Sequence, residues 1–407
     1  MTPIIRLAAT ASLAFALAAP ALAQTSTALN GQIQWGDVVA DINVASQANA
    51  HSTSAVATAA GNSVSGANIT GGLDAESAQQ MTGSTWSTAT LRTGNVTDAT
   101  ALSTAQANTA QAQTVDGDLK LKSYQSARGG DVNARTTVNT GNARTISAAS
   151  SAASNNLATA ADHGDLNGDV QQFATNSVRA VTDVDACCSG RTIAGASAAV
   201  NAWSSASTTS TVTAKYDQQS WGPASEATTD VYQYRAWDVT AATTAAANSA
   251  SLVNEWGYAN IRGRQTSATD VKADTRVTLG GWSGTAGVSS YGVGNSTLAT
   301  NVGSDMVVDV AQINTGGVEA NAQFNGASTD YGDVVLASTA IGNGFTGYVC
   351  SKCGDASLAG TVSQTNAGNV RSTGSITTTG AGMIVGSASA IGNSATFVTT
   401  QSSGGGP

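Results

Sequence analysis

The sequence predicts an all-β protein, a right- or left-handed β-solenoid (β-helix) of about eight repeats of 46–47 residues. Two observations lead to this fold class. Asn residues with mostly small neighbours recur at nearly constant spacing from Asn62 to Asn393, and Gln residues recur in step with them from Gln34 to Gln364. Self-similarity at a fixed period is typical of proteins in which each unit packs only against its neighbours.

Each of the two columns contributes one amide side chain per repeat. The Asn column consists of Asn62, Asn108, Asn155, Asn201, Asn248, Asn295, Asn343 and Asn393, and the Gln column of Gln34, Gln79, Gln125, Gln172, Gln219, Gln265, Gln312 and Gln364. In stacked strands an amide lies above its copy in the next layer, and the two side chains can hydrogen-bond. We therefore predict two structural ladders along the axis of the solenoid.

The composition favours stacked strands over a helical array. Ala, Ser, Thr, Asn and Gly dominate, only 11% of residues are charged, and apolar residues rarely recur at helical spacing. The polar character also fits a disordered chain, but the 41% hydrophobic content and the shared period of the two columns argue against disorder. The sequence leaves open whether one repeat forms one coil or two, which gives a rod of roughly 40 or roughly 80 Å.

The chain divides into three segments. Arg6 precedes the short apolar run from Leu7 to Leu17, and Ala21-Leu22-Ala23 completes a secretory signal peptide. That apolar run is shorter than the ~20 residues that a membrane-spanning helix needs. We predict a signal peptide over residues 1–23, a single solenoid domain over residues 24–401 and a flexible tail over residues 402–407, in a protein that is exported to the cell surface.

Charge and residue types exclude several classes of function. A net charge of -9 and an isoelectric point near 4.6 leave no basic face for nucleic acid. The repeated polar positions are mostly amides, which cannot act as general acids or bases near neutral pH. We therefore expect no enzyme activity, no cofactor and no metal site, and we rank a β-helix enzyme acting on polysaccharide as the least favoured alternative.

Four cysteines form two local groups, Cys187-Cys188 and Cys350-Ser351-Lys352-Cys353. In an exported chain disulfides are expected, and the distance between the two groups along the chain favours pairing within each group. A redox CxxC motif and half of a zinc site are alternatives. No second cysteine pair at zinc spacing supports the metal, and no thioredoxin-like pattern surrounds the motif.

Aromatic residues concentrate in the middle of the sequence. If they are stacked on an exposed face, they can contact the apolar faces of sugar rings, since Trp and Tyr combine flat apolar area with a polar group. The alternative is that they fill a wider interior or cover corners. The candidate polysaccharide contacts are Trp221, Tyr232, Tyr234, Trp237, Trp256 and Tyr258.

Some stretches of the repeats resemble a known family. Gly94-Asn95-Val96-Thr97-Asp98-Ala99 and Gly117-Asp118-Leu119, together with the signal peptide and the small Cys groups, resemble the holdfast attachment protein D family of stalked alphaproteobacteria. The resemblance implies a protein associated with the outer membrane at the cell surface. Beside other anchor proteins, which are the implied partners, it would help tie the adhesive holdfast polysaccharide to that membrane.

Two later segments are loosely similar to curlin-type amyloid repeats. Gln312-Ile313-Asn314-Thr315-Gly316 and Gln364-Thr365-Asn366-Ala367-Gly368 share a Gln-x-Asn-x-Gly arrangement, although a curlin unit is much shorter than this period. An open end of a strand stack also invites pairing with another chain. The alternative function is therefore a self-assembling, amyloid-like fibre subunit whose copies join end to end.

Overall fold

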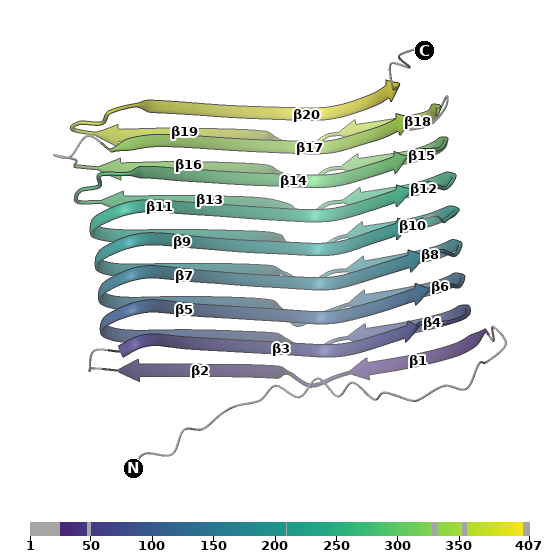
Figure 1. The fold of residues 1–407 in the computed structure, drawn as a ribbon, viewed down its shortest axis with the longest axis horizontal. Coiled ribbons are helices and arrows are strands. Elements are labelled where there is room, and N and C mark those ends of the chain that lie inside the picture. The colour runs from purple at the N-terminus through teal and green to yellow at the C-terminus, as the bar shows by residue number, and fades with distance from the viewer. Residues whose placement is uncertain (1–24, 47–49, 209, 328–331, 352–355, 402–407) are drawn as a thin grey trace, which may run out of the picture.

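The computed structural model describes residues 25–46, 50–208, 210–327, 332–351 and 356–401. It confirms the all-β prediction and shows a flattened β-solenoid of parallel strands (Figure 1). The coils of the chain stack on one another, and we call each of the eight coils a rung. Each repeat forms one complete rung, so one coil per repeat is the correct alternative. The predicted signal peptide and tail lie outside the described residues. None of the described residues forms a helix of the length and apolarity that a bilayer-spanning helix requires.

Short strands of nine residues form one parallel eight-stranded sheet. These strands are β1 (Ser26–Gln34), β4 (Leu73–Met81), β6 (Leu119–Ala127), β8 (Leu166–Ala174), β10 (Val212–Ser220), β12 (Ala259–Ser267), β15 (Met306–Asn314) and β18 (Leu358–Asn366).

Much longer strands complete the rungs. Four of them are unbroken: β5 (Thr85–Val115), β7 (Val132–Asp162), β9 (Val178–Thr208) and β11 (Ala224–Glu255). In the first rung and the last three rungs the same path is divided into two strands. These pairs are β2 (Val38–Ser46) and β3 (Ala50–Asn68), β13 (Asp270–Leu279) and β14 (Thr285–Val302), β16 (Val318–Gly326) and β17 (Asp333–Ser351), and β19 (Val370–Thr378) and β20 (Ile384–Gln401).

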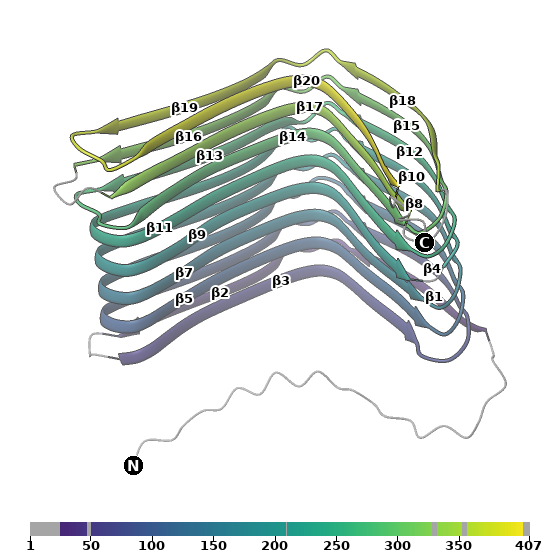
Figure 2. The same ribbon diagram turned by 45° about the horizontal axis from the view of Figure 1, so that its top comes forward.

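The second rung illustrates the path of the chain. After β4 the chain turns at residues 82–84 and continues as the first part of β5, which completes the back layer. The strand then curves through residues 94–97, a rounded turn that we call the arc, and returns as the front layer to a corner at residues 116–118. Figure 2 shows that the front layer is bent near its middle. Neighbouring rungs pair in register, with Gln79 opposite Gln125 and Asn108 opposite Asn155.

The bend in the front layer coincides with the Asn column. Side chains alternate between inside and outside along a strand, but Ala107 and Asn108 are both buried, so the alternation shifts there. The Asn108 side chain donates a hydrogen bond from Nδ2 to the carbonyl oxygen of Ser126 in the back layer, at 3.0 Å. The amide therefore ties the bend to the layer behind it.

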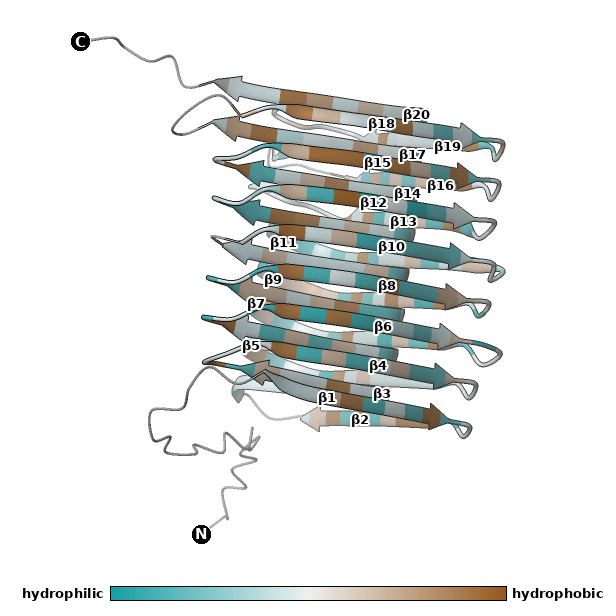
Figure 3. Ribbon diagram, turned by 90° about the vertical axis from the view of Figure 1, so that its right-hand side faces the viewer, coloured by the Kyte–Doolittle hydropathy of each residue, from teal (hydrophilic) through white to brown (hydrophobic). Residues whose placement is uncertain are grey.

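The core consists of three apolar clusters arranged from one end of the flattened cross-section to the other. One lies beside the arc and contains Leu91 and Ile146, one lies beside the corner and contains Leu119 and Trp203, and an alanine-rich one lies between them. Small inward residues let the two layers approach closely. Inward hydroxyls bond across the gap, as when Thr182 donates to the carbonyl oxygen of Gly195 at 2.7 Å. Figure 3 shows apolar and polar residues alternating along the strands.

The corner requires a left-handed backbone conformation. Asp116, His163 and Trp256 occupy it with φ of 56°, 55° and 66°, and Gly303 occupies it in a later rung with φ of 94°. Such values are uncommon for residues other than Gly. The residue type changes from rung to rung at this position, so the sequence carries no repeated signal for it.

Candidate functional site

The Asn column forms a continuous ladder through the interior. From Asn62 to Asn343, each side chain donates Nδ2 to Oδ1 of the Asn in the next rung at 2.8 Å, and the last bond reaches Asn393. The second N–H of each donating amide bonds a backbone carbonyl of the back layer, as Asn201 does with Gln219 at 3.0 Å. Every amide of this column between its two end members therefore has partners for its N–H groups and its carbonyl.

The Gln ladder runs with the opposite polarity. Each Nε2 donates to Oε1 of the Gln in the preceding rung, at 2.7–3.0 Å, and the second N–H bonds a front-layer carbonyl. The members are Gln32, Gln79, Gln125, Gln172, Gln218, Gln265, Gln312 and Gln364.

The prediction was wrong for two members of the Gln column, Gln34 and Gln219. Gln34 lies opposite Met81 and donates to the Gly36 carbonyl at 3.1 Å, whereas Gln32 lies opposite Gln79. Gln219 points away from the interior and bonds Asp217, because adjacent residues on a strand face opposite sides. The neighbouring Gln218 is fully buried and occupies the ladder position. A step of 46 and a step of 47 residues fit either Gln of that doublet, so spacing could not choose between them.

A third repeated bond was missed by the sequence analysis. At the turns, six Asp carboxylates each accept a backbone N–H from the following rung at 2.6–3.0 Å: Asp37, Asp118, Asp165, Asp238, Asp270 and Asp305. At Asp305 the N–H and the hydroxyl of Ser357 both donate, and these bonds lower the pKa of the carboxyl group. The available signal was the Asp that stands just before a strand at four of these positions, Asp37, Asp118, Asp165 and Asp305.

The adjacent cysteines lie on the arc of β9. Their sulfur atoms are 2.9 Å apart as thiols, longer than the ~2.05 Å of a disulfide bond. A hydrogen bond between the two thiols and partial burial raise the pKa of Cys188. Cys350 belongs to β17, and Cys353 lies outside the described residues. Both local bridges therefore stay predictions.

The six candidate aromatic contacts belong to the fifth rung or to the corner that follows it. Trp221 lies at the turn between β10 and β11, whereas Trp256 and Tyr258 lie at the corner. They are between 40 and 62% exposed and spread around the perimeter, so they do not form one stacked face. Only Tyr234 and Trp237 lie together on the arc, with Tyr232 just before it.

Other aromatic residues of the middle region fill the interior. Trp203 and Tyr216 are buried and pack edge to face with ring centroids 5.8 Å apart. Trp282, also buried, lies between β13 and β14, packs edge to face against Phe324 at 4.9 Å and donates Nε1–H to the Asp333 carbonyl at 3.1 Å. The two interpretations of the aromatic residues thus apply to different members of the group.

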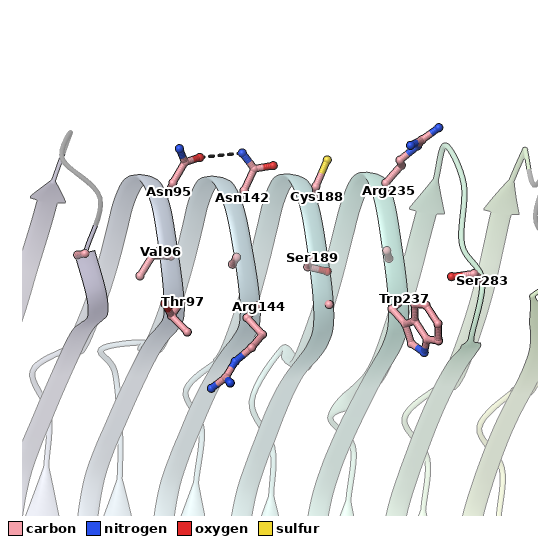
Figure 4. A pocket seen from close by; sticks show the side chains of 14 residues that line it. Asn95, Val96, Thr97, Asn142, Arg144, Cys188, Ser189, Arg235, Trp237 and Ser283 are labelled. Atoms are coloured by element: carbon pink, nitrogen blue, oxygen red, sulfur yellow. Dashed lines mark hydrogen bonds between the residues drawn. The ribbon is translucent and has the colours of Figure 1, made fainter.

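A shallow groove of about 830 Å³ crosses the arcs, from Ala50 in the first rung to Ser283 in the sixth. Its floor is formed by small side chains that recur at one position of each arc: Val96, Ala143, Ser189 and Ala236. Figure 4 shows two rows of side chains that diverge from this floor. One row is Asn95, Asn142, Cys188 and Arg235, and the opposite row includes Thr97, Arg144 and Trp237.

The groove carries positive charge. Arg144 and Arg235 line it, and none of its lining residues that the structure describes is Asp or Glu. Asp98 lies just outside and accepts hydrogen bonds from Thr145 and, at 3.4 Å, from Arg144, and the Thr145 bond is the main cause of its lowered pKa. Arg235 forms no ion pair with any residue that the structure describes. Within that same part of the chain, no cluster of His, Cys, Asp and Glu could hold a metal ion.

Comparison with known families assigns the chain. The sequence profile of Holdfast attachment protein D matches residues 47–317, which is more than half of the chain. The chain belongs to this family. The part of the chain that matches the family profile extends from the first rung to the turn before β16. It therefore includes every arc that lines the groove. It confirms the resemblance seen in the sequence and associates the chain with the holdfast adhesive system at the cell surface. Neither the curated proteins nor the solved structures contain a match.

Proposed function

We propose that this holdfast attachment protein is an exported, non-catalytic anchor that helps fasten the adhesive polysaccharide to the outer membrane through other surface anchor proteins. The observation that supports the proposal most directly is the family match across the stacked rungs. Export itself rests on the predicted signal peptide at residues 1–23.

The architecture suits a load-bearing connector. Two amide ladders of opposite polarity run through the interior, and the turn aspartates link successive rungs at the perimeter. Each rung pairs with its neighbours over most of its length, for example through more than two dozen residue pairs between β7 and β9. These bonds make one stiff unit whose exposed side faces can contact partners.

Retention of the purified full chain on isolated holdfast material tests this proposal. We expect the wild-type protein to be retained both on holdfast material and on outer-membrane vesicles from cells that carry the other anchor proteins. Vesicles from cells lacking those proteins are the control. A chain that binds neither holdfast material nor vesicles contradicts the anchor function.

A second candidate function, end-to-end self-assembly, is favoured by the ends of the ladders. Asn393 Nδ2 and Asn62 Oδ1 bond no described residue, and they are the donor and the acceptor that one further Asn step would join. The Gln ladder ends in the complementary sense, with an available N–H on Gln32 and an available Oε1 on Gln364. Head-to-tail stacking would continue both ladders at once.

Sedimentation distinguishes this second candidate from the anchor alone. We expect the full chain to form linear oligomers that lengthen with concentration, and Asn62→Asp with Gln32→Glu to shorten them, because these changes remove the donor on Gln32 and place charge at the joint. Exposed Asp41→Asn on β2 is the control. A wild-type chain that stays monomeric at all concentrations eliminates self-assembly but leaves the anchor function standing.

A further inference from the structure

The groove over the arcs has the form of a track for an extended polymer. Its walls repeat once per rung, and successive rungs are ~4.8 Å apart, so the stretch from the first to the sixth rung is about 24 Å long. The continuous curvature depends on the unbroken strands β5, β7, β9 and β11. At Ser283 the path is divided between β13 and β14, and the groove ends there.

The charge of the groove favours an anionic occupant. The whole chain carries a net charge of -9, yet the described residues that line the groove include two arginines and no carboxylate. Arg235 is exposed and has no ion pair with a described residue. The Arg144–Asp98 pair is 3.4 Å long with both side chains largely exposed, and such a pair is weak. Both guanidinium groups can therefore bind an acidic ligand.

The remaining wall groups suit sugars. Trp237 is 62% exposed, and the flat aromatic surface of an indole can stack on a sugar ring. Asn142 donates to Asn95 at 2.7 Å, which leaves an N–H of Asn95 and a lone pair of the Asn142 carbonyl for hydroxyl groups. The two rows of side chains thus supply an aromatic surface, donors and an acceptor on either side of the floor.

A peptide strand fits the groove less well. An extended peptide usually binds by adding to a free strand edge. The four unbroken strands that form most of the groove have none there, because β5, β7, β9 and β11 each pair with a described strand on both sides. Recognition in the groove must therefore come from side chains, as is usual for carbohydrates.

We propose that the groove over the arcs binds an acidic polysaccharide that runs parallel to the axis of the solenoid, held by Arg144 and Arg235 and stacked on Trp237. This inference rests on the proposed anchor function, which it extends by naming the binding surface and the class of sugar. One polymer chain would contact several rungs in succession, so weak contacts would add along its length.

Binding of the full chain to immobilised polygalacturonate and to immobilised neutral dextran tests the inference. We expect wild-type protein to bind polygalacturonate and not dextran. Arg235→Glu and Trp237→Ala should each weaken binding by about tenfold or more, the loss expected when roughly 1.4 kcal/mol of contact energy is removed. The matched control is Arg262→Glu, which makes the same charge change at an exposed residue of β12 outside the groove. It should leave the affinity unchanged.

Several results would overturn the inference. Equal losses in Arg235→Glu and Arg262→Glu would mean a general charge effect, and equal binding to dextran would remove the requirement for acid groups. Displacement by poly-L-glutamate as effective as that by free polygalacturonate would remove the requirement for sugar. If both groove variants bind polygalacturonate as tightly as the wild type does, the binding site lies elsewhere.

The same variants on isolated holdfast material separate this inference from the anchor function. If wild type and both groove variants are retained equally, the groove inference fails and the anchor function stands. If the wild type itself is not retained, the anchor function fails. If retention of the protein on holdfast material depends on Arg235 and Trp237 but the protein does not bind polygalacturonate, the acidic class of sugar is rejected.

Discussion

A buried side-chain amide stabilises a protein only when its N–H groups and its carbonyl all have partners. In the Asn ladder this condition is met rung by rung. Asn201 receives a bond from Asn155, gives one to Asn248 and gives another to the Gln219 carbonyl, each between 2.8 and 3.0 Å. Removing one such side chain leaves its neighbours buried without partners, which costs ~1–3 kcal/mol for each group.

Asn201→Ala should therefore lower the free energy of unfolding by about 3 kcal/mol, because at least one donor and one acceptor lose their partner. The matched control is Asn62→Ala at the end of the same ladder, where the side chain makes bonds to only one neighbouring rung. We expect a loss near 1 kcal/mol there. Urea unfolding followed by circular dichroism measures both, and equal losses at the two positions would contradict a load shared along the ladder.

The turn aspartates give the protein a predictable response to acid. The pKa of Asp305 is lowered from its ordinary value near 3.8 by the bonds from Ser357. Because the folded pKa lies below the unfolded one, the contribution of Asp305 to stability is complete above the unfolded pKa. It is lost as the pH falls through the folded pKa.

Asp305→Asn should consequently lower the melting temperature at pH 7, and its difference from wild type should shrink as the pH falls toward 2, because protonation of the wild-type carboxyl removes the charge from its bonds to Ser357. Thermal unfolding measured at intervals between these pH values checks this. Asp74→Asn, at an exposed carboxylate of β4 that bonds no described residue, is the control and should change little at either pH. A constant difference between Asp305→Asn and wild type at every pH would argue against the charge-assisted bond.

At the scale of the element, the break between β13 and β14 coincides with a single inserted side chain. Trp282 occupies the interior where β13 gives way to β14, and Gly332 of the next rung lies against its indole ring. A Cβ on Gly332 would lie 2.2 Å from the ring, so a glycine at that place is required by the tryptophan. The unbroken arcs of earlier rungs hold small residues instead.

Trp282→Ala should destabilise the chain by about 3–5 kcal/mol, as expected when a large buried aromatic is removed. Trp237→Ala, at an exposed tryptophan of the neighbouring arc, is the control and should cost less than ~0.5 kcal/mol. Denaturant unfolding of the two variants compares them directly. Similar losses for both would mean that Trp282 is not a packing residue.

The sequence predicted the fold class but not the length of its strands. The repeated Asn and Gln establish which residues lie above one another, and this is enough for a parallel stack. The arc and the bend at Asn108 are curved continuations of single strands, and nothing in the local composition distinguishes a curved strand from two strands and a turn. The groove was missed because its lining residues, such as Asn95, Arg144 and Trp237, share no residue type that recurs from repeat to repeat.

At the scale of the whole molecule, the repeats behave as interchangeable rungs. Each rung contacts only the rungs above and below it, so the free energy of unfolding is approximately a sum of terms for single rungs and for the interfaces between them. Leu119 lies opposite Leu166 in the next rung, and the two residues begin equivalent strands.

Deletion of residues 119–165 removes one whole rung and joins equivalent positions. We expect the shortened chain to fold, with a smaller dependence of unfolding free energy on urea because less surface is exposed on unfolding. Deletion of residues 119–142, about half a rung, should abolish the cooperative transition. If both deletions fold equally well, one coil per repeat is incorrect.

The parallel alignment of all strands has a mechanical consequence. A force applied along the axis would separate the outermost rung by opening its backbone hydrogen bonds a few at a time. A force applied along the strand direction would instead have to shear an entire row of bonds simultaneously. The solenoid therefore resists a force along its strands better than a force along its axis. A polymer that contacts many rungs would distribute its tension over all of them.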